Sequence, residues 1–264
     1  MNDRGITEGG EMNGELRLSL TASEERAVSE LIRLCNEADN TSYDTAAEWD
    51  FCYLYENPGE AESGVREPLL SVLFGYRIGE REQGREVLEL SAFTHPRLRR
   101  QGLLRGSLNA LQDDFRNFSW HFVLKPLRTA EGVREGRLPE SAEKTVRALS
   151  FRRLHDELFL RKTLTRGIAN PRDSLSNRYG ELHFTPYHTD TLYLYGLLVY
   201  DRYLGQGHGR ALMEAAEHFE SGPYRQILLQ VSSRNEIACG LYASLGYEVV
   251  DRSMVYAFSC KERS

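Results

Sequence analysis

The sequence has few cysteines and no excess of basic residues. Its 264 residues include four cysteines, and Cys35, Cys52, Cys239 and Cys260 lack the paired spacing of a metal site. In a chain of this length they are also not typical of a disulfide framework. The formal net charge of −6 argues against an extended nucleic-acid-binding face. We therefore expect no metal and no nucleic-acid partner.

Long hydrophobic runs are missing as well. Residues 1–14 are polar and rich in glycine, unlike a signal peptide, and no later stretch is apolar for long enough to span a bilayer. Hydrophobic residues make up 41% of the chain and charged residues 27%, as in ordinary globular domains. These properties predict a soluble, cytoplasmic protein with no membrane partner.

The most informative stretch is a glycine-rich turn between a predicted strand and a predicted helix. The apolar run at residues 192–199 predicts a buried strand. Gly205, Gly207 and Gly209 follow it, and apolar residues at helical spacing begin at Ala211. Such a turn presents free N–H groups and the positive end of a helix where glycines leave room for an anion. It predicts a phosphate or pyrophosphate site, although a plain strand-to-helix turn has the same glycines.

A second pattern lies on the helix that follows the next predicted strand, residues 226–231. The alternating glycines of the turn fit neither a Walker loop nor Gly-x-Gly-x-x-Gly. With the run from Asn235 to Tyr247, however, the turn resembles the GNAT superfamily of acyl-CoA-dependent N-acetyltransferases. That family has Arg/Gln-x-x-Gly-x-Gly/Ala at its pyrophosphate loop and Asn-x-x-Ala-x-x-Leu-Tyr-x-x-x-Gly-Phe/Tyr on the next helix. The second motif is matched here without a gap.

This resemblance implies a cosubstrate, acetyl-CoA, and a set of residues that bind it. The implied cofactor-binding residues are Leu198, Val199, Gln206, Gly207, His208, Gly209, Arg210 and Asn235. Tyr242 stands at the position of the general acid, and a phenol with a pKa of about 10 is protonated at neutral pH. Leu204 departs from the family, because Arg or Gln usually stands at its position.

Several of these residues also have a purely structural interpretation. Tyr242 is a candidate core tyrosine, Asn235 a candidate helix N-cap, and His208 a loop residue that offers only its N–H. Tyr193 and Tyr195 share one face of the predicted strand. Either one of them faces the acceptor of the acetyl group, or both pack in the core.

The first half of the chain predicts the same order of elements. They are a strand at 16–20, a helix behind the capping box Thr21-Ala22-Ser23-Glu24, a helix at 45–55, a hairpin of strands at 69–78 and 86–94, a helix at 104–118, a strand at 120–124, an inserted loop at 126–143, a short helix at 142–149 and a closing strand at 157–160.

The loop of this half also resembles the pyrophosphate loop. Arg99 and Gly102 occupy the Arg and first Gly positions of the family motif. Leu104 replaces the final Gly/Ala, Val146 the Tyr and Ser150 the Gly, so we interpret the first half as the degenerate copy.

The sequence therefore predicts an α+β (α/β mixed) fold of tandem GNAT domains, each a mixed, mostly antiparallel sheet flanked by helices. The degenerate N-terminal domain spans 15–164, and the C-terminal domain with the acetyl-CoA site spans 165–264, after a linker near 165–177. The second copy is truncated at its N-terminal end. It begins with a hairpin at 180–199, lacks a clear opening strand and helix pair, and closes with a strand at 247–258.

The expected function is an N-acetyltransferase that transfers an acetyl group from acetyl-CoA to a primary amine by direct attack in a ternary complex. The acceptor is a small molecule or a peptide, and residues 49–55 are expected to help form its pocket. The general base is unassigned: Glu181, His183 and His188 are candidates, and a water relay serves equally.

Two alternatives stay open. One is a non-catalytic acyl-CoA-binding sensor or scaffold, which Leu204 and the degenerate first half favour. The other places the cofactor in the first half, where Arg99 keeps the family's residue.

Overall fold

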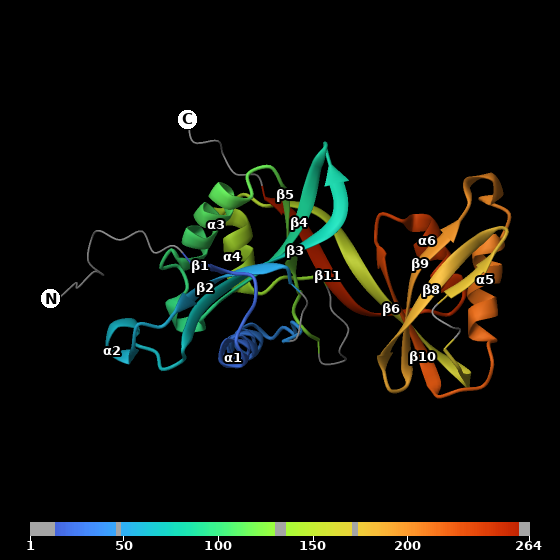
Figure 1. Ribbon diagram of the computed structural model, residues 1–264, viewed down its shortest axis with the longest axis horizontal. Coiled ribbons are helices and arrows are strands. Elements are labelled where there is room, and N and C mark those ends of the chain that lie inside the picture. The colour runs from blue at the N-terminus through green and yellow to red at the C-terminus, as the bar shows by residue number, and fades with distance from the viewer. Residues whose placement is uncertain (1–13, 46–48, 130–135, 171–173, 259–264) are drawn as a thin grey trace. The chain divides into compact units, whose positions relative to one another are not determined.

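The computed structural model describes residues 14–45, 49–129, 136–170 and 174–258. These residues fold into two compact units, each with its own hydrophobic core (Figure 1). The first unit takes the chain up to residue 127, then 137–154 and the residues from 255 onward, and the second takes 128–136 and 155–254. None of the described helices is both long enough and apolar enough to cross a membrane.

The first unit is a mixed, mostly antiparallel sheet with helices on its faces. Its elements are β1 (Glu15–Arg17), α1 (Ala22–Asp39), β2 (Phe51–Glu56), α2 (Glu60–Ser63), β3 (Leu69–Glu82), β4 (Arg85–Thr94), the 3-10 helix η1 (Pro96–Leu98), α3 (Leu103–Asp114), β5 (Ser119–Leu124) and α4 (Glu140–Ala148). The strands pair in the order β1-β2-β3-β4-β5, and only β4 and β5 are parallel.

Helix α1 begins at the predicted capping box, which is confirmed. The Glu24 N–H donates to Thr21 Oγ1 at 3.3 Å, and the Thr21 N–H donates to Glu24 Oε2 at 2.7 Å. The helix ends at Asn40, which adopts a left-handed conformation with φ 51°. Its apolar stripe, Val28, Leu31, Ile32 and Cys35, is buried in the core.

The helix predicted at residues 45–55 is wrong, because Phe51–Glu56 form the strand β2. Five consecutive residues of this strand, Phe51–Tyr55, are buried. A strand that is covered on both faces has no alternation of polar and apolar residues, so its sequence resembles a segment of buried helix. None of these five residues lines either of the two cavities described below, and the expectation that 49–55 help form the acceptor pocket stays a prediction.

The two faces of β2 are covered by different helices. Cys52 belongs to the core cluster of α1. On the other face Phe51 stacks on Phe115 with ring centroids 4.2 Å apart, and Tyr53 Oη donates to Asp114 Oδ2 at 2.6 Å, at the end of α3. Figure 1 shows α1 and α3 on opposite faces of the sheet.

The second unit repeats this arrangement with fewer elements before its loop. Its elements are β6 (Arg152–Ile168), β7 (Ser174–Asn177), β8 (Gly180–His188), β9 (Thr191–Val199), the 3-10 helix η2 (Asp201–Tyr203), α5 (His208–Glu217), β10 (Tyr224–Ser232), α6 (Glu236–Ser244) and β11 (Glu248–Phe258), of which the start of β6 and the end of β11 belong to the first unit. β6-β10-β9-β8-β7 is the strand order, and only β9 and β10 are parallel. In the part of this unit that the structure describes, no helix precedes β8, as the predicted truncation requires.

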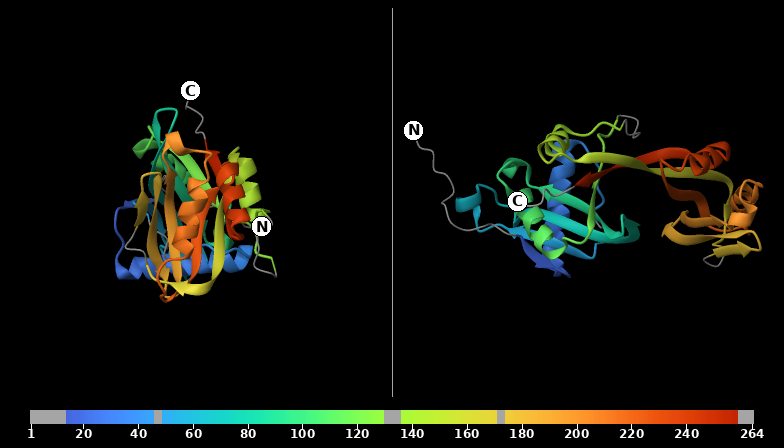
Figure 2. Two further views of the ribbon diagram at one scale, coloured as in Figure 1. Left: turned by 90° about the vertical axis from the view of Figure 1, so that its right-hand side faces the viewer. Right: turned by 90° about the horizontal axis from the view of Figure 1, so that it is seen from above.

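Helix α5 covers one face of this sheet, as the left view of Figure 2 shows. Leu212, Met213 and Ala216 of the helix are buried in one cluster with residues of every strand from β8 to β10. The members from β8 and β9 are Leu182, Phe184, Leu192 and Leu194. Burial on this scale stabilises the unit by roughly 1.5–3 kcal/mol for each large aliphatic side chain.

Strand β6 is longer than the sequence predicts and has a different partner. The segment 157–160 was expected to close the first domain, yet β6 pairs with β10 of the second unit, with Leu160 opposite Leu229. The strand continues to Ile168, so the start of the predicted linker at 165–177 is wrong. The predicted domain boundary between residues 164 and 165 lies inside β6.

The internal duplication is visible in two matching helix ends. Helices α4 and α6 are both followed by a residue in the left-handed region, Ser150 with φ 55° and Gly246 with φ 83°. The Phe151 N–H donates to the Val146 carbonyl at 2.9 Å, and the Tyr247 N–H donates to the Tyr242 carbonyl at 3.0 Å. Both are Schellman ends, in which glycine is the preferred residue at the left-handed position.

We predict that Ser150→Gly stabilises the first unit by about 1 kcal/mol, because a side chain in the left-handed region costs roughly 1–2 kcal/mol. Both tryptophans of the chain, Trp49 and Trp120, lie in this unit. Urea unfolding followed by tryptophan fluorescence therefore measures the change. Gly246→Ser is the mirror variant and should lower the midpoint of unfolding followed by circular dichroism. An unchanged midpoint for Ser150→Gly would contradict the argument.

Candidate active site

The glycine-rich turn of the second unit leads from β9 into the first turn of α5, as predicted. Gly205 and Gly207 adopt φ values of 72° and 83°, in the region that favours glycine. Helix α5 begins at His208, and its first intrahelical bond runs from the Ala211 N–H to the Gly207 carbonyl at 3.1 Å. The N–H groups of residues 208–210 precede that bond and have no acceptor within the helix. Such N–H groups are the donors from which helix N-termini build anion sites.

The side chains of this turn are engaged with the protein itself. His208 stacks on Tyr179 with ring centroids 3.8 Å apart, and Gln206 Nε2 donates to the Arg202 carbonyl at 3.1 Å. Arg210 Nη2 donates to Ser244 Oγ at 2.5 Å and so joins α5 to α6. The turn therefore offers mainly backbone donors, in line with the interpretation of His208 as a loop residue.

Strands β9 and β10 separate beyond the end of their parallel pairing. Their register ends at Leu194 opposite Leu229, although both strands continue. Just after Leu194, Gly196 adopts φ 63°, at an irregularity in the pairing of β9 with β8. A Cβ on Gly196 would lie 3.0 Å from the ring of His183, which is tighter than ordinary contact. Glycine thus permits the bulge that turns β9 away from β10.

A cavity of about 310 Å³ lies at this splay. That volume falls in the usual range of ligand pockets, roughly 300–1,000 Å³. The lining residues from β9, β10 and α6 are Leu194, Tyr195, Gly196, Leu197, Gln230, Val231, Ser232, Asn235, Ala238 and Tyr242. Of the predicted site residues, Asn235 and Tyr242 line the cavity together. Leu198 and Val199 lie just beyond it on β9, and their neighbour Leu197 lines it instead.

The turn approaches this cavity through the first turn of α5. A Cβ on Gly209 would lie 3.6 Å from both Val199 Cγ2 and Leu241 Cδ2, so the helix start contacts the end of β9 and the side of α6. Gln206, Gly207, His208 and Arg210 belong to the same turn but do not line the cavity.

Asn235 and Tyr242 each have a structural role in addition. The Asn235 side chain caps α6, where Oδ1 accepts from the Ala238 N–H at 3.1 Å. Tyr242 is 6% exposed and packs against Tyr247, with ring centroids 5.9 Å apart. Burial raises the pKa of Tyr242, with a smaller contribution from Cys239. The phenol is therefore protonated at neutral pH and can donate a proton.

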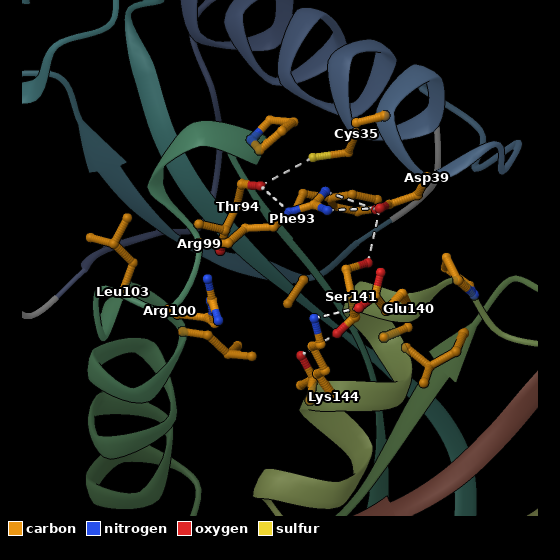
Figure 3. Close-up of a pocket in the computed structure, with 18 of the residues that line it drawn as sticks. Cys35, Asp39, Phe93, Thr94, Arg99, Arg100, Leu103, Glu140, Ser141 and Lys144 are labelled. Carbon is orange, nitrogen blue, oxygen red and sulfur yellow. Dashed lines mark hydrogen bonds and ion pairs between the residues drawn. The ribbon is translucent and has the colours of Figure 1, made fainter.

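The first unit holds a second candidate site with the same backbone (Figure 3). η1 leads through Arg100, with φ 66°, and Gly102, with φ 92°, into α3. These two residues correspond to Gly205 and Gly207. The cavity beside them has a volume of about 1030 Å³ and is bordered by α1, the ends of β4 and β5, the loop and α4.

Arg99, the one side chain that the loop shares with the family motif, forms an ion pair with Asp39 at this cavity. Arg99 Nη1 and Nη2 donate to the two carboxylate oxygens of Asp39 at 2.7 and 2.8 Å, and Ser141 Oγ donates to Asp39 Oδ1 at 2.9 Å (Figure 3). Burial opposes the charge of Arg99, but its bonds to Asp39 outweigh burial and raise its pKa. The pair thus ties α1, the loop and α4 together.

The two sites differ at the residues that would perform chemistry. Helix α4 begins after Pro139, where α6 begins after Asn235. Val146 stands at the position of Tyr242. The first site therefore keeps the backbone donors of the turn and lacks both the capping amide and the acid.

Comparisons with known proteins agree with this geometry. Residues 175–247 match the model of the acetyltransferase (GNAT) family. The resemblance to the GNAT superfamily is confirmed. The family match supports acyl transfer from acyl-CoA as the class of reaction.

Solved structures carry the same fold over most of the chain. A GCN5-related N-acetyltransferase from Sphaerobacter thermophilus is 14% identical, with a TM-score of 0.59 over 92% of this chain and 94% of its own. A tandem GNAT protein from the clavulanic acid biosynthesis pathway is 11% identical, with a TM-score of 0.55 over 94% of this chain and 100% of its own. The predicted tandem GNAT fold is therefore confirmed. No match was found among curated proteins.

Sequence reasoning missed residues that long-range pairing brings to the two sites. Asp39 is 60 positions from Arg99, and nothing in the local sequence links them. Gln230 lines the second cavity and donates to Glu157 Oε2 at 3.1 Å. Glu157 was assigned to the other domain. The one available signal was the alternation of side chains along 226–231, which places Gln230 on the face of the strand opposite to the buried Leu229.

We predict that Asp39→Ala destabilises the first unit by about 2 kcal/mol, because it leaves the half-buried Arg99 without its partner. Ser141→Ala removes a single hydrogen bond and should cost about 1 kcal/mol. Urea unfolding followed by tryptophan fluorescence measures both. Equal costs for the two variants would show that the ion pair contributes no more than the hydroxyl.

Proposed function

We propose that the chain is an acetyl-CoA-dependent N-acetyltransferase and that its second unit carries the reaction. The supporting observation is the cavity at the splay of β9 and β10, which brings Asn235 and Tyr242 together. The family match over residues 175–247 spans the turn, this cavity and Tyr242.

Acetyl-CoA would bind chiefly through backbone groups. The N–H groups of the turn, from Gln206 to Arg210, would hold the pyrophosphate at the N-terminus of α5. Leu198 and Val199 would meet the pantetheine arm at the free end of β9, and Asn235 would contact it from α6. Leu204 supplies no charge here, so affinity would depend on the turn itself.

The reaction would proceed by direct attack. The ammonium first loses a proton to water. The resulting amine nitrogen then bonds to the thioester carbonyl carbon, the carbon–sulfur bond breaks, and the nitrogen loses a second proton to water. Tyr242 donates its phenolic proton to the departing thiolate and regains one from solvent. Holding both reactants in one cavity would supply much of the rate, because it makes the encounter local.

Tyr242→Phe should lower kcat about 100-fold while acetyl-CoA affinity is retained, because general acids typically contribute roughly 10²–10⁴-fold. Since burial raises the pKa of Tyr242 above that of an ordinary phenol, turnover should decline only at a more alkaline pH than an exposed tyrosine would give, and the variant should lack that decline. CoA release measured against pH tests both points. Tyr247→Phe removes a neighbouring hydroxyl outside the cavity and is the control. An unchanged kcat in Tyr242→Phe would remove the acid from the mechanism.

The second candidate function is non-catalytic acyl-CoA binding by the first unit. The observation that favours it is the larger cavity there, about 1030 Å³, beside a turn of the same backbone. Val146 provides no acid, so this site would bind without turnover.

A matched pair of variants separates the two sites. Gly209 and Leu104 occupy the same position in the first turn of α5 and α3. Gly209→Trp should abolish turnover and one acetyl-CoA site in calorimetric titration, because the indole fills the space between β9 and α6. Leu104→Trp should leave turnover intact, and a lost site in this variant would reveal binding by the first unit. Turnover that survives Gly209→Trp but not Leu104→Trp would move the reaction to the first unit.

A further inference from the structure

The sheet face of the second unit that α5 leaves uncovered is unusually aromatic. Leu192 and Leu194 of β9 are buried on the α5 side. Side chains alternate along a strand, so Tyr193 and Tyr195 lie on the opposite face. His183 of β8 pairs with Tyr195 and shares that face.

The aromatic rings on this face form a continuous row. Centroids are 6.2 Å apart between Tyr187 and Tyr193, 6.3 Å between Tyr193 and Tyr195, and 5.4 Å between Tyr195 and His183. Tyr187 is 50% exposed and Tyr195 is 46% exposed within the described residues. Contiguous exposed patches of large apolar side chains mark interaction or ligand-binding sites.

This row ends in the cavity of the proposed reaction. Tyr195 lines that cavity together with Gln230 and Tyr242. A molecule lying along the row would therefore present one end to the place where Tyr242 protonates the leaving group.

Carboxylates flank the row on both sides. On the β10 side, Glu157 accepts from Gln230 Nε2 at 3.1 Å and lies 2.8 Å from His155 Nε2. The Glu157 side chain is mostly buried, and Nδ1 of His155 has no hydrogen-bond partner among the described residues. Two donors thus fix the carboxylate next to a residue that lines the cavity.

On the β8 side, Glu181 Oε1 lies 3.8 Å from His183 Nε2, next to Tyr195. By the same alternation Arg153 and Arg161 of β6 share the face of Glu157, each four residues, or about 13 Å, away from it along the strand. Glu157 and Glu181 are the carboxylates in contact with residues of the cavity or the row, and they make the potential at this end more negative.

An electronegative pocket of aromatic rings favours cations for two reasons. Opposite charges attract more strongly where water is partly excluded, and a cation over an aromatic face gains about 0.5–2 kcal/mol more. Burial raises the pKa of Tyr193, and the charge of Glu157 adds to that effect, which agrees with a negative potential at the row.

We propose that the acceptor is a primary amine whose cationic group has no carboxylate beside it, held along Tyr193, Tyr195 and His183 and selected by Glu157 and Glu181. This rests on the proposed function for the second unit. Glu157 acts as a positioning residue: it holds Gln230 at the cavity and supplies negative charge. An amino acid carries its own carboxylate next to the amine and is repelled.

The test compares amines that differ only in that carboxylate. Tyramine and phenethylamine are the probes, and tyrosine and phenylalanine are their carboxylate-bearing counterparts. With the full chain and saturating acetyl-CoA, CoA release should give kcat/KM for tyramine at least about tenfold above that for tyrosine. Calorimetry with tyramine alone measures amine binding without the cosubstrate.

Two isosteric variants then separate selection by charge from a structural role. Glu157→Gln should raise KM for tyramine about tenfold with kcat little changed, because one charged contact is lost. For the same reason it should lower the ratio of kcat/KM for tyramine to that for tyrosine. Acetyl-CoA affinity should stay as in the wild type. Glu248→Gln, on β11 of the same unit, is the control and should change nothing. A purely structural role of Glu157 would instead lower turnover of tyramine and tyrosine alike.

The outcomes distinguish this inference from the function on which it rests. Two outcomes would overturn the cationic acceptor and leave the acetyl-CoA site standing. In the first, the protein acetylates tyrosine with the same kcat/KM as tyramine. In the second, it binds acetyl-CoA but neither binds nor acetylates either probe. Tyramine binding in a chain that does not bind acetyl-CoA overturns the proposed function and keeps the cation site. Loss of tyramine binding in Glu181→Gln but not in Glu157→Gln would move the selecting charge to β8.

Discussion

The separation of two parallel strands is the constraint on which both sites depend. In each unit one parallel pair, β4 with β5 or β9 with β10, stops pairing before its strands end. A parallel pair requires a crossover, and here the crossover is a helix that follows the first strand after a 3-10 helix and a left-handed turn. The chain therefore opens a gap between the strands and places a helix N-terminus at its mouth. The cavity and the helix N-terminus beside it follow from one topological feature.

A large part of this arrangement could be predicted from local sequence. The capping box at Thr21, the glycine turn before α5 and the helix end at Gly246 are set by backbone conformations that few residues adopt. Such signals are contained within a few positions. The fold itself was inferred from the resemblance of the glycine turn and of Asn235–Tyr247 to the GNAT motifs, and the order of elements around them agrees with it.

The parts that sequence reasoning got wrong depend on what covers a strand and which strand lies next to it. β2 is buried on both faces, which removes the alternation that marks a strand. The sequence of β6 predicts a strand in either domain, but local sequence does not determine that this strand pairs with β10. The pairing places Glu157 beside Gln230 and so adds a carboxylate next to the second cavity. Asp39 was missed for the same reason.

The two copies show which features of the site are retained when its side chains differ. Backbone donors at a helix start require only the left-handed turn, and the first unit keeps that turn even with Arg100 where the second has Gly205. The proposed acid is one side chain, and Val146 stands at its position in the first unit. Arg99 still occupies its position but is held by Asp39. The turn is therefore the more durable feature of the two, since many sequences build it, whereas the proposed acid depends on a single side chain.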